Sequence, residues 1–80
     1  MKSFQELDTV VLTHDLPAAG LRAGDPGAIV QRYAPDTVEV EFVTGSGRAQ
    51  ALLTVSDADV RAVRDDDLFA VRSAPHRGAA

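Results

Sequence analysis

Side chains that could act as catalytic bases or nucleophiles are few in this 80-residue chain. Its two histidines are His14 and His76, and cysteine is absent. A serine nucleophile needs a base and an orienting group in contact with it. His14 is followed by Asp15, but Ser46 and Ser56 belong to unrelated predicted turns. We therefore predict that the chain is not an enzyme and that His14 is a solvated loop residue.

Metal and phosphate sites are not indicated either. The acidic run from Asp65 to Asp67 matches no calcium loop, and we interpret it as a solvated charge run or as the acidic first turn of a short helix. The segment Gly45-Ser46-Gly47-Arg48 lacks the lysine and the downstream helix of a P-loop, so we predict a hairpin turn there. We expect no metal and no cofactor.

The charge balance disfavours nucleic acid as a partner. Lys and Arg number 8 against 12 Asp and Glu, which gives a net charge of −4. Proteins that bind nucleic acid usually present a basic surface, with aromatic side chains on exposed strands where bases stack. Glu39 and Glu41 take that position here. A KOW-like nucleic-acid-binding barrel is kept as an alternative, because a local basic patch can exist on an acidic protein.

The elements that must position these residues are short β-strands. The clearest is 37–43, where apolar residues alternate with polar ones, so that one face is buried and the other is wet. Its apolar members are Val38, Val40 and Phe42. Further strands are expected at 8–13, 28–33, 49–55 and 60–63.

Turns and a cap separate the strands. Gly24-Asp25-Pro26-Gly27 is predicted as a β-turn, because these residue types favour turn conformations. Ser56 is predicted to cap one helical turn over 56–59. Strand 49–55 carries apolar residues at adjacent positions, including Leu52 and Leu53, and is expected to be buried on both faces.

The order of these elements indicates a fold class. Short strands at about ten-residue spacing without a long amphipathic helix are typical of a small barrel. The predicted order is a strand, a long loop, a turn, a three-strand meander, a helical turn and a last strand. This order predicts an all-β, five-stranded SH3-like barrel with one short helical turn. We assign residues 1–63 to the barrel and residues 64–80 to a C-terminal tail that is partly disordered.

Apolar residues outside the expected core are candidates for partner contact. Leu16, Pro17 and Leu21 would form a rim next to Tyr33, unless the two leucines plug the mouth of the barrel. The tail offers Leu68 and Phe69, unless they fold back as a cap. With the acidic strand face added, the predicted partner-binding residues are Leu16, Pro17, Leu21, Tyr33, Glu39, Glu41, Leu68 and Phe69.

Three stretches together carry a family resemblance. They are Leu12-Thr13-His14-Asp15-Leu16-Pro17, then Gly20-Leu21 with Gly24-Asp25-Pro26-Gly27-Ala28-Ile29-Val30, then Val38-Glu39-Val40-Glu41-Phe42. Over residues 7–63 the chain resembles a bacterial domain-of-unknown-function family of small SH3-like barrels. The resemblance implies the fold and no catalytic residues. The chain is more loosely similar to the SH3-like domain of nitrile hydratase β subunits, but it lacks the Arg-rich segment of that family.

These observations predict a non-catalytic protein-interaction module, either antitoxin- or immunity-like or an accessory protein that binds a specific partner. An acidic surface suits a basic partner. The alternative within the same architecture is an accessory subunit or activator of a larger enzyme, and self-association is open. The lack of cysteine, of an apolar signal-peptide region and of a membrane-length run makes the cytoplasm the expected location, with no membrane partner.

Overall fold

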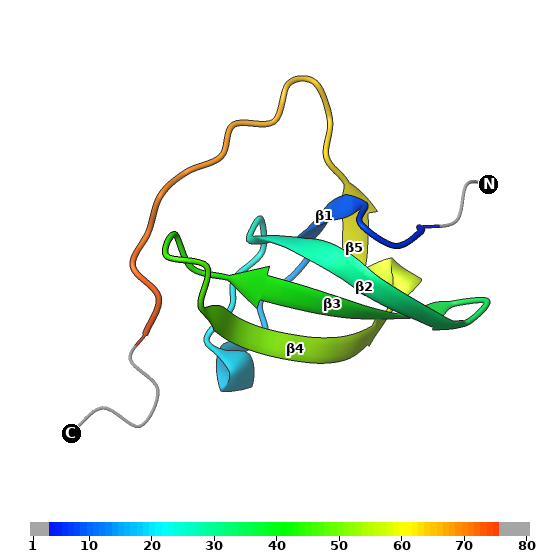
Figure 1. Cartoon of the computed structure of the whole chain (residues 1–80). Helices are drawn as coiled ribbons and strands as arrows, with labels where there is room; N and C mark the ends of the chain where they lie inside the picture. The colour runs from blue at the N-terminus through cyan, green and yellow to red at the C-terminus, as the bar shows by residue number, and fades with distance from the viewer. Residues whose placement is uncertain (1–3, 76–80) are drawn as a thin grey trace.

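Five antiparallel strands form one bent sheet in the computed structural model, which describes residues 4–75 (Figure 1). Their order across the sheet is β4-β3-β2-β1-β5. The predicted all-β, five-stranded barrel is thereby confirmed. The strands are β1 (Thr9–Leu12), β2 (Pro26–Ala34), β3 (Thr37–Val43), β4 (Ala49–Ser56) and β5 (Val60–Ala62).

The core forms on the inner face of this sheet. Val38, Val40 and Phe42 of β3 are at most 2% exposed, as their alternation predicted. Burial of each side chain of this size stabilises the fold by about 1.5–3 kcal/mol. Gly27 lets β2 pass close above them, because a Cβ at this position would lie 2.7 Å from Cγ1 of Val40.

Two short 3-10 helices join the strands. The first, η1 (Pro17–Ala19), ends at Gly20, whose φ of 72° is the left-handed conformation that glycine adopts without strain. The second, η2 (Asp57–Asp59), has Ser56 as its N-cap and a complete capping box with Asp59. The predicted helical turn and its cap are therefore confirmed.

The hairpin between β3 and β4 is also where it was predicted. Thr44 N–H donates to the carbonyl of Arg48 at 2.8 Å, and Gly47 has a φ of 86°. The turn before β2, however, lies earlier than expected. The amide of Asp25 bonds the carbonyl of Arg22 at 3.0 Å, and Pro26 already begins β2, where its missing N–H is tolerated at the first position of a strand.

The expected burial of β4 on both faces is wrong. Leu52 is 55% exposed, because it lies on the outer face of β4 and only the inner face meets the core. Glu41 is the partner of Leu52 in register, so both belong to the outer face.

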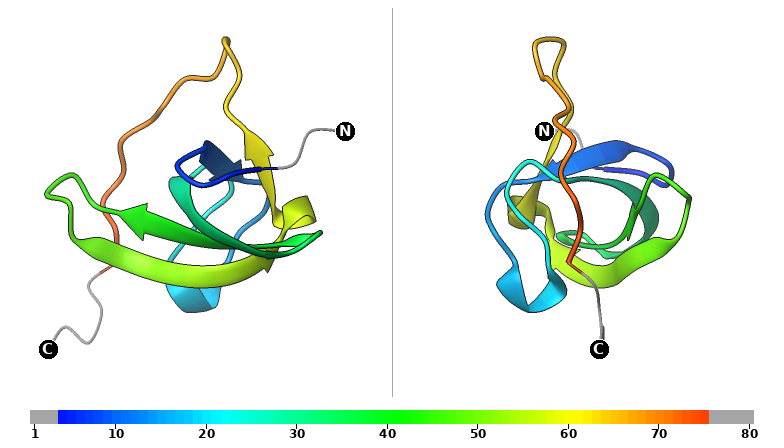
Figure 2. Two further views of the ribbon diagram at one scale, coloured as in Figure 1. Left: turned by 45° about the vertical axis from the view of Figure 1, so that its right-hand side comes forward. Right: turned by 90° about the vertical axis from the view of Figure 1, so that its left-hand side faces the viewer.

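Beyond β5 the chain leaves the barrel and returns to it. Residues 63–75 contain no helix or strand. Figure 2 shows them standing off the barrel past β5 and coming back toward the hairpin between β3 and β4. Residues 1–3 and 76–80 lie outside the described residues. His76 and the end of the predicted tail are among them. Within 4–75, no helix is long and apolar enough to cross a membrane.

Candidate functional site

The segment after β5 presents apolar side chains to solvent. Leu68 is 94% exposed, Phe69 60% and Val71 102%. Leu68–Val71 is called the apolar segment below. Leu68 and Phe69 therefore do not fold back as a cap, which was one of the two outcomes open from the sequence. Three exposed apolar side chains within four residues make this segment the candidate interaction surface.

One ion pair fixes the start of the apolar segment to the barrel. Nη1 and Nη2 of Arg61 donate to the two carboxylate oxygens of Asp67, each at 2.9 Å. The amide of Arg64 adds a third bond to Asp67 at 2.6 Å. The Arg61 guanidinium, assisted by this amide, lowers the pKa of Asp67 to about 2. The predicted charge run is thus a tight turn around one paired carboxylate rather than the first turn of a helix.

A second ion pair fixes the end of the segment. Arg72 Nε donates to Asp25 Oδ1 at 3.1 Å, and Arg72 Nη2 donates both to Asp25 Oδ2 and to the carbonyl of Gly20, the latter at 3.1 Å. Burial pushes the pKa of Asp25 upward, but the hydrogen bonds from Arg72 and from the Arg22 amide outweigh it and leave the pKa lowered. Pro75 then packs on Gly20, where a Cβ would lie 2.7 Å from Cγ of Pro75.

A cavity of about 300 Å³ separates the returning chain from the barrel. Leu21, Phe42 and Gln50 line its barrel side, and Ala70 and Ala74 line its other side. The C-terminal segment therefore covers this end of the barrel through residues 70–75. The exposed side chains of Leu68 and Phe69 take no part in this cover.

The long loop before β2 differs from the predicted rim. Leu21 is only 4% exposed and belongs to the core, so it plugs the barrel and is closed to a partner. Leu16 is half-buried against the core and pairs with Leu21 through backbone bonds of 2.9 and 3.1 Å. Of the three predicted rim residues only Pro17, at the start of η1, is exposed. The predicted rim at Leu16 and Leu21 is corrected on this point, because a short β-bridge turns both side chains inward.

Tyr33 does not join that loop. It lies near the far end of β2, and its hydroxyl donates to Oε1 of Glu39 at 2.8 Å. This hydrogen bond to a carboxylate raises the pKa of Tyr33. Glu41 lies on the same outer face, beside the exposed Leu52. The sequence alone did not identify Leu52 as an exposed residue. Its register with Glu41 of β3 would have been needed to place it on the outer face.

His14 is less isolated than predicted. Its Nε2 is 2.7 Å from Oδ1 of Asp59, and its Nδ1 is 3.1 Å from the carbonyl of Asp15. The hydrogen bond to Asp59 and then the one to the Asp15 carbonyl raise the pKa of His14. Neither ring nitrogen has a hydroxyl as its partner. His14 is an exposed loop residue, as predicted, and its half-exposed side chain also joins the long loop to η2.

No group of metal-ligating side chains that could hold an ion occurs within residues 4–75. The acidic run does not converge on one point, since Asp65 and Asp66 are exposed while Asp67 faces Arg61.

A family model described as "Domain of unknown function (DUF4926)" matches residues 6–62. The match includes all five strands and ends before the apolar segment. Comparison with curated proteins gives no match, and comparison with solved structures gives none. Because the family model matches more than half of the chain, this barrel is a member of the DUF4926 family, as the sequence resemblance to a domain-of-unknown-function family predicted.

Proposed function

We propose that this chain is a non-catalytic protein-interaction module whose apolar segment binds a protein partner. The observation that carries the proposal is the exposure of Leu68, Phe69 and Val71 in a segment that two ion pairs fix to the barrel, one at each end. An isolated flexible tail would lose much conformational entropy on binding. A segment fixed at both ends loses less, so more of its apolar burial contributes to affinity.

The net charge of the molecule supports one kind of partner over others. A net charge of −4 favours a partner with a basic surface, because complementary potentials speed encounter and exclude acidic competitors. Glu39 and Glu41 add to this field from the outer face of β3. An antitoxin-like, immunity-like or accessory role fits such a module, and the lack of cysteine supports a place in the reducing cytoplasm.

Site-specific photo-crosslinking tests the proposal. A photoreactive phenylalanine at position 69 is expected to give one dominant heterologous product in cells of the source organism. The control carries the same residue at Leu7, which is 85% exposed and lies outside the segment. Equal products from both positions, or none from position 69, would contradict the proposal.

A further inference from the structure

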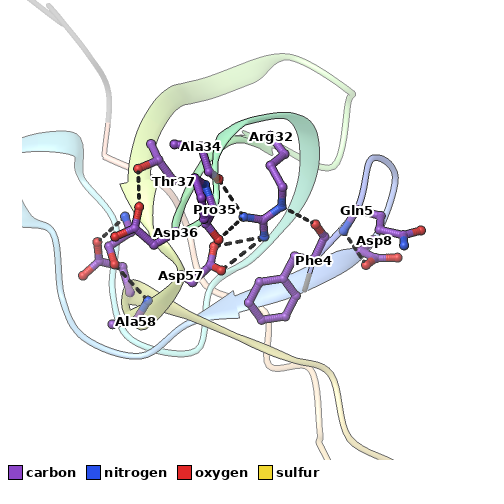
Figure 3. A network of polar contacts seen from close by, with 12 residues as sticks. Phe4, Gln5, Asp8, Arg32, Ala34, Pro35, Asp36, Thr37, Asp57 and Ala58 are labelled. Carbon is purple, nitrogen blue, oxygen red and sulfur yellow. Dashed lines mark hydrogen bonds and ion pairs between the residues drawn. The ribbon is translucent and has the colours of Figure 1, made fainter. Parts of the chain in front are cut away.

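A second surface lies at another part of the barrel, around Arg32 (Figure 3). A groove of about 910 Å³ runs between the N-terminal segment, the turn from β2 to β3, η2 and the chain of β5. Phe4, Pro35, Val60 and Val63 are among its apolar lining residues. The apolar segment contributes nothing to this lining.

Arg32 holds three walls of the groove in place. Its Nε donates to the carbonyl of Phe4 at 2.8 Å, and its Nη1 donates to the carbonyls of Ala34 and Pro35 at 3.0 and 2.8 Å. Its Nη2 donates to both carboxylate oxygens of Asp57, at 3.1 and 3.2 Å. One guanidinium thus connects the N-terminal segment, the β2–β3 turn and η2, so the groove is built before any partner arrives.

The rim of the groove is acidic. Asp8, Asp36 and Asp57 line it. Arg32 is paired with Asp57 in an ion pair. Arg61, which also lines the groove, is paired with Asp67. Asp8 accepts a hydrogen bond from the Gln5 amide only at Oδ2, and Asp36 accepts one from the Thr37 hydroxyl only at Oδ1, within residues 4–75. Among residues 4–75, the second oxygen of each carboxylate accepts no such bond and can contact a cation.

From this combination we infer that the groove binds a peptide segment of a protein partner in which lysine or arginine stands beside apolar side chains. Apolar side chains would pack against Phe4 and Val63, and a cationic group would reach Asp8 or Asp36. A second copy of this chain is a poor occupant, because both copies carry a net charge of −4. Nucleic acid is disfavoured by the sign of the rim charge.

The test uses a designed probe and the full chain. The probe is an eight-residue peptide in which lysine alternates with leucine, and its control replaces each lysine by glutamate. Titration followed by two-dimensional NMR is expected to shift the amides of Phe4, Asp36 and Ala58 with the lysine peptide and to leave them unchanged with the glutamate peptide. Failure to bind, equal shifts from both peptides, or shifts confined to Glu39 and Glu41 would overturn the inference.

Charge-matched variants separate a built groove from general attraction. The double variant Asp8→Asn, Asp36→Asn keeps an oxygen acceptor at each position and is expected to weaken binding of the lysine peptide about fivefold. The control Asp65→Asn, Asp66→Asn removes the same charge from exposed positions of the tail and is expected to weaken it less than twofold. Equal weakening by the two pairs would show long-range attraction only and would overturn the inference.

Discussion

Arg72 forms a bidentate ion pair with Asp25, which lies 47 residues earlier in the chain. Asp25 follows the turn that leads into β2, and Arg72 follows the apolar segment. The pair therefore ties a segment outside the matched family region to the barrel. It explains how Leu68 and Phe69 can be exposed and still hold a defined position.

Removal of Arg72 tests this tie. Arg72→Ala is expected to lower the free energy of unfolding by about 1 kcal/mol, since the pair is only partly exposed and carries several hydrogen bonds. It is also expected to lower the backbone heteronuclear NOE values of residues 70–74. Arg48→Ala, which removes an exposed arginine from the β3–β4 hairpin, serves as the control and should change neither quantity. Unchanged NOE values in Arg72→Ala would show that the ion pair does not order the segment.

Asp67 predicts a stability change in acid. Its pKa is lowered from 3.8 to about 2 in the folded chain. A carboxyl group with a depressed folded pKa stabilises the fold above its unfolded pKa and loses this contribution as pH falls through the folded value. The contribution of Asp67 should therefore be complete above about pH 5, fall steeply between about pH 4 and pH 2, and disappear below about pH 2. Urea unfolding at a series of pH values should show Asp67→Asn destabilised at neutral pH and the difference from wild type shrinking steadily between pH 4 and pH 2, and a constant difference would contradict the pairing.

His14 predicts a change in the opposite direction near neutrality. Its folded pKa is raised above 6.5 by Asp59 and by the Asp15 carbonyl. A raised pKa gives stability that is complete below the unfolded value and is lost as pH rises through the folded value. The Tm of wild type is therefore expected to fall as pH rises from 6 to 8, and His14→Gln should remove most of that fall. His76→Gln is the control, and a fall of the same size in both variants would contradict the link to η2.

Alanine substitutions at two glycines with positive φ separate the cost of backbone strain from the cost of a clash with Pro75. Gly20 and Gly24 have φ values of 72° and 90°, but only Gly20 has Pro75 within reach of an added Cβ. Gly24→Ala is expected to cost about 1 kcal/mol from backbone strain alone. Gly20→Ala should cost about 1 kcal/mol more, or displace Pro75 from the barrel. Chemical denaturation with NMR shifts of residues 73–75 measures both, and equal effects of the two variants would show that Pro75 does not pack on Gly20.

The parts of the fold that the sequence predicted depend on local patterns. The alternation of β3 placed Val38, Val40 and Phe42 in the core, and Ser56 marked the start of η2. Both features are set by residues a few positions apart. The turn before β2 was displaced because Pro26 is compatible both with a turn and with the first position of a strand.

The parts that could not be predicted depend on contacts between distant residues. No local pattern indicates that Arg72 pairs with Asp25 or that Arg32 joins the N-terminal segment to η2. The burial of Leu21 follows from its bridge to Leu16, which is a loop conformation rather than a periodic element. The exposure of Leu52 follows from its register with Glu41 at a sheet edge. The predicted contacts at Leu68 and Phe69 remain predictions that binding must test.

The most direct test is the affinity of the purified chain for the protein that crosslinks through position 69. Leu68→Ser, Phe69→Ser removes two exposed side chains and should leave the free energy of unfolding within about 0.5 kcal/mol of wild type. Its Kd is expected to rise at least about tenfold, because buried aromatic and aliphatic anchors each contribute more than about 1 kcal/mol to binding. Leu7→Ser, at another exposed leucine, should leave Kd unchanged. An unchanged Kd in the double variant, with the fold intact, would contradict the assignment of the apolar segment as the binding surface.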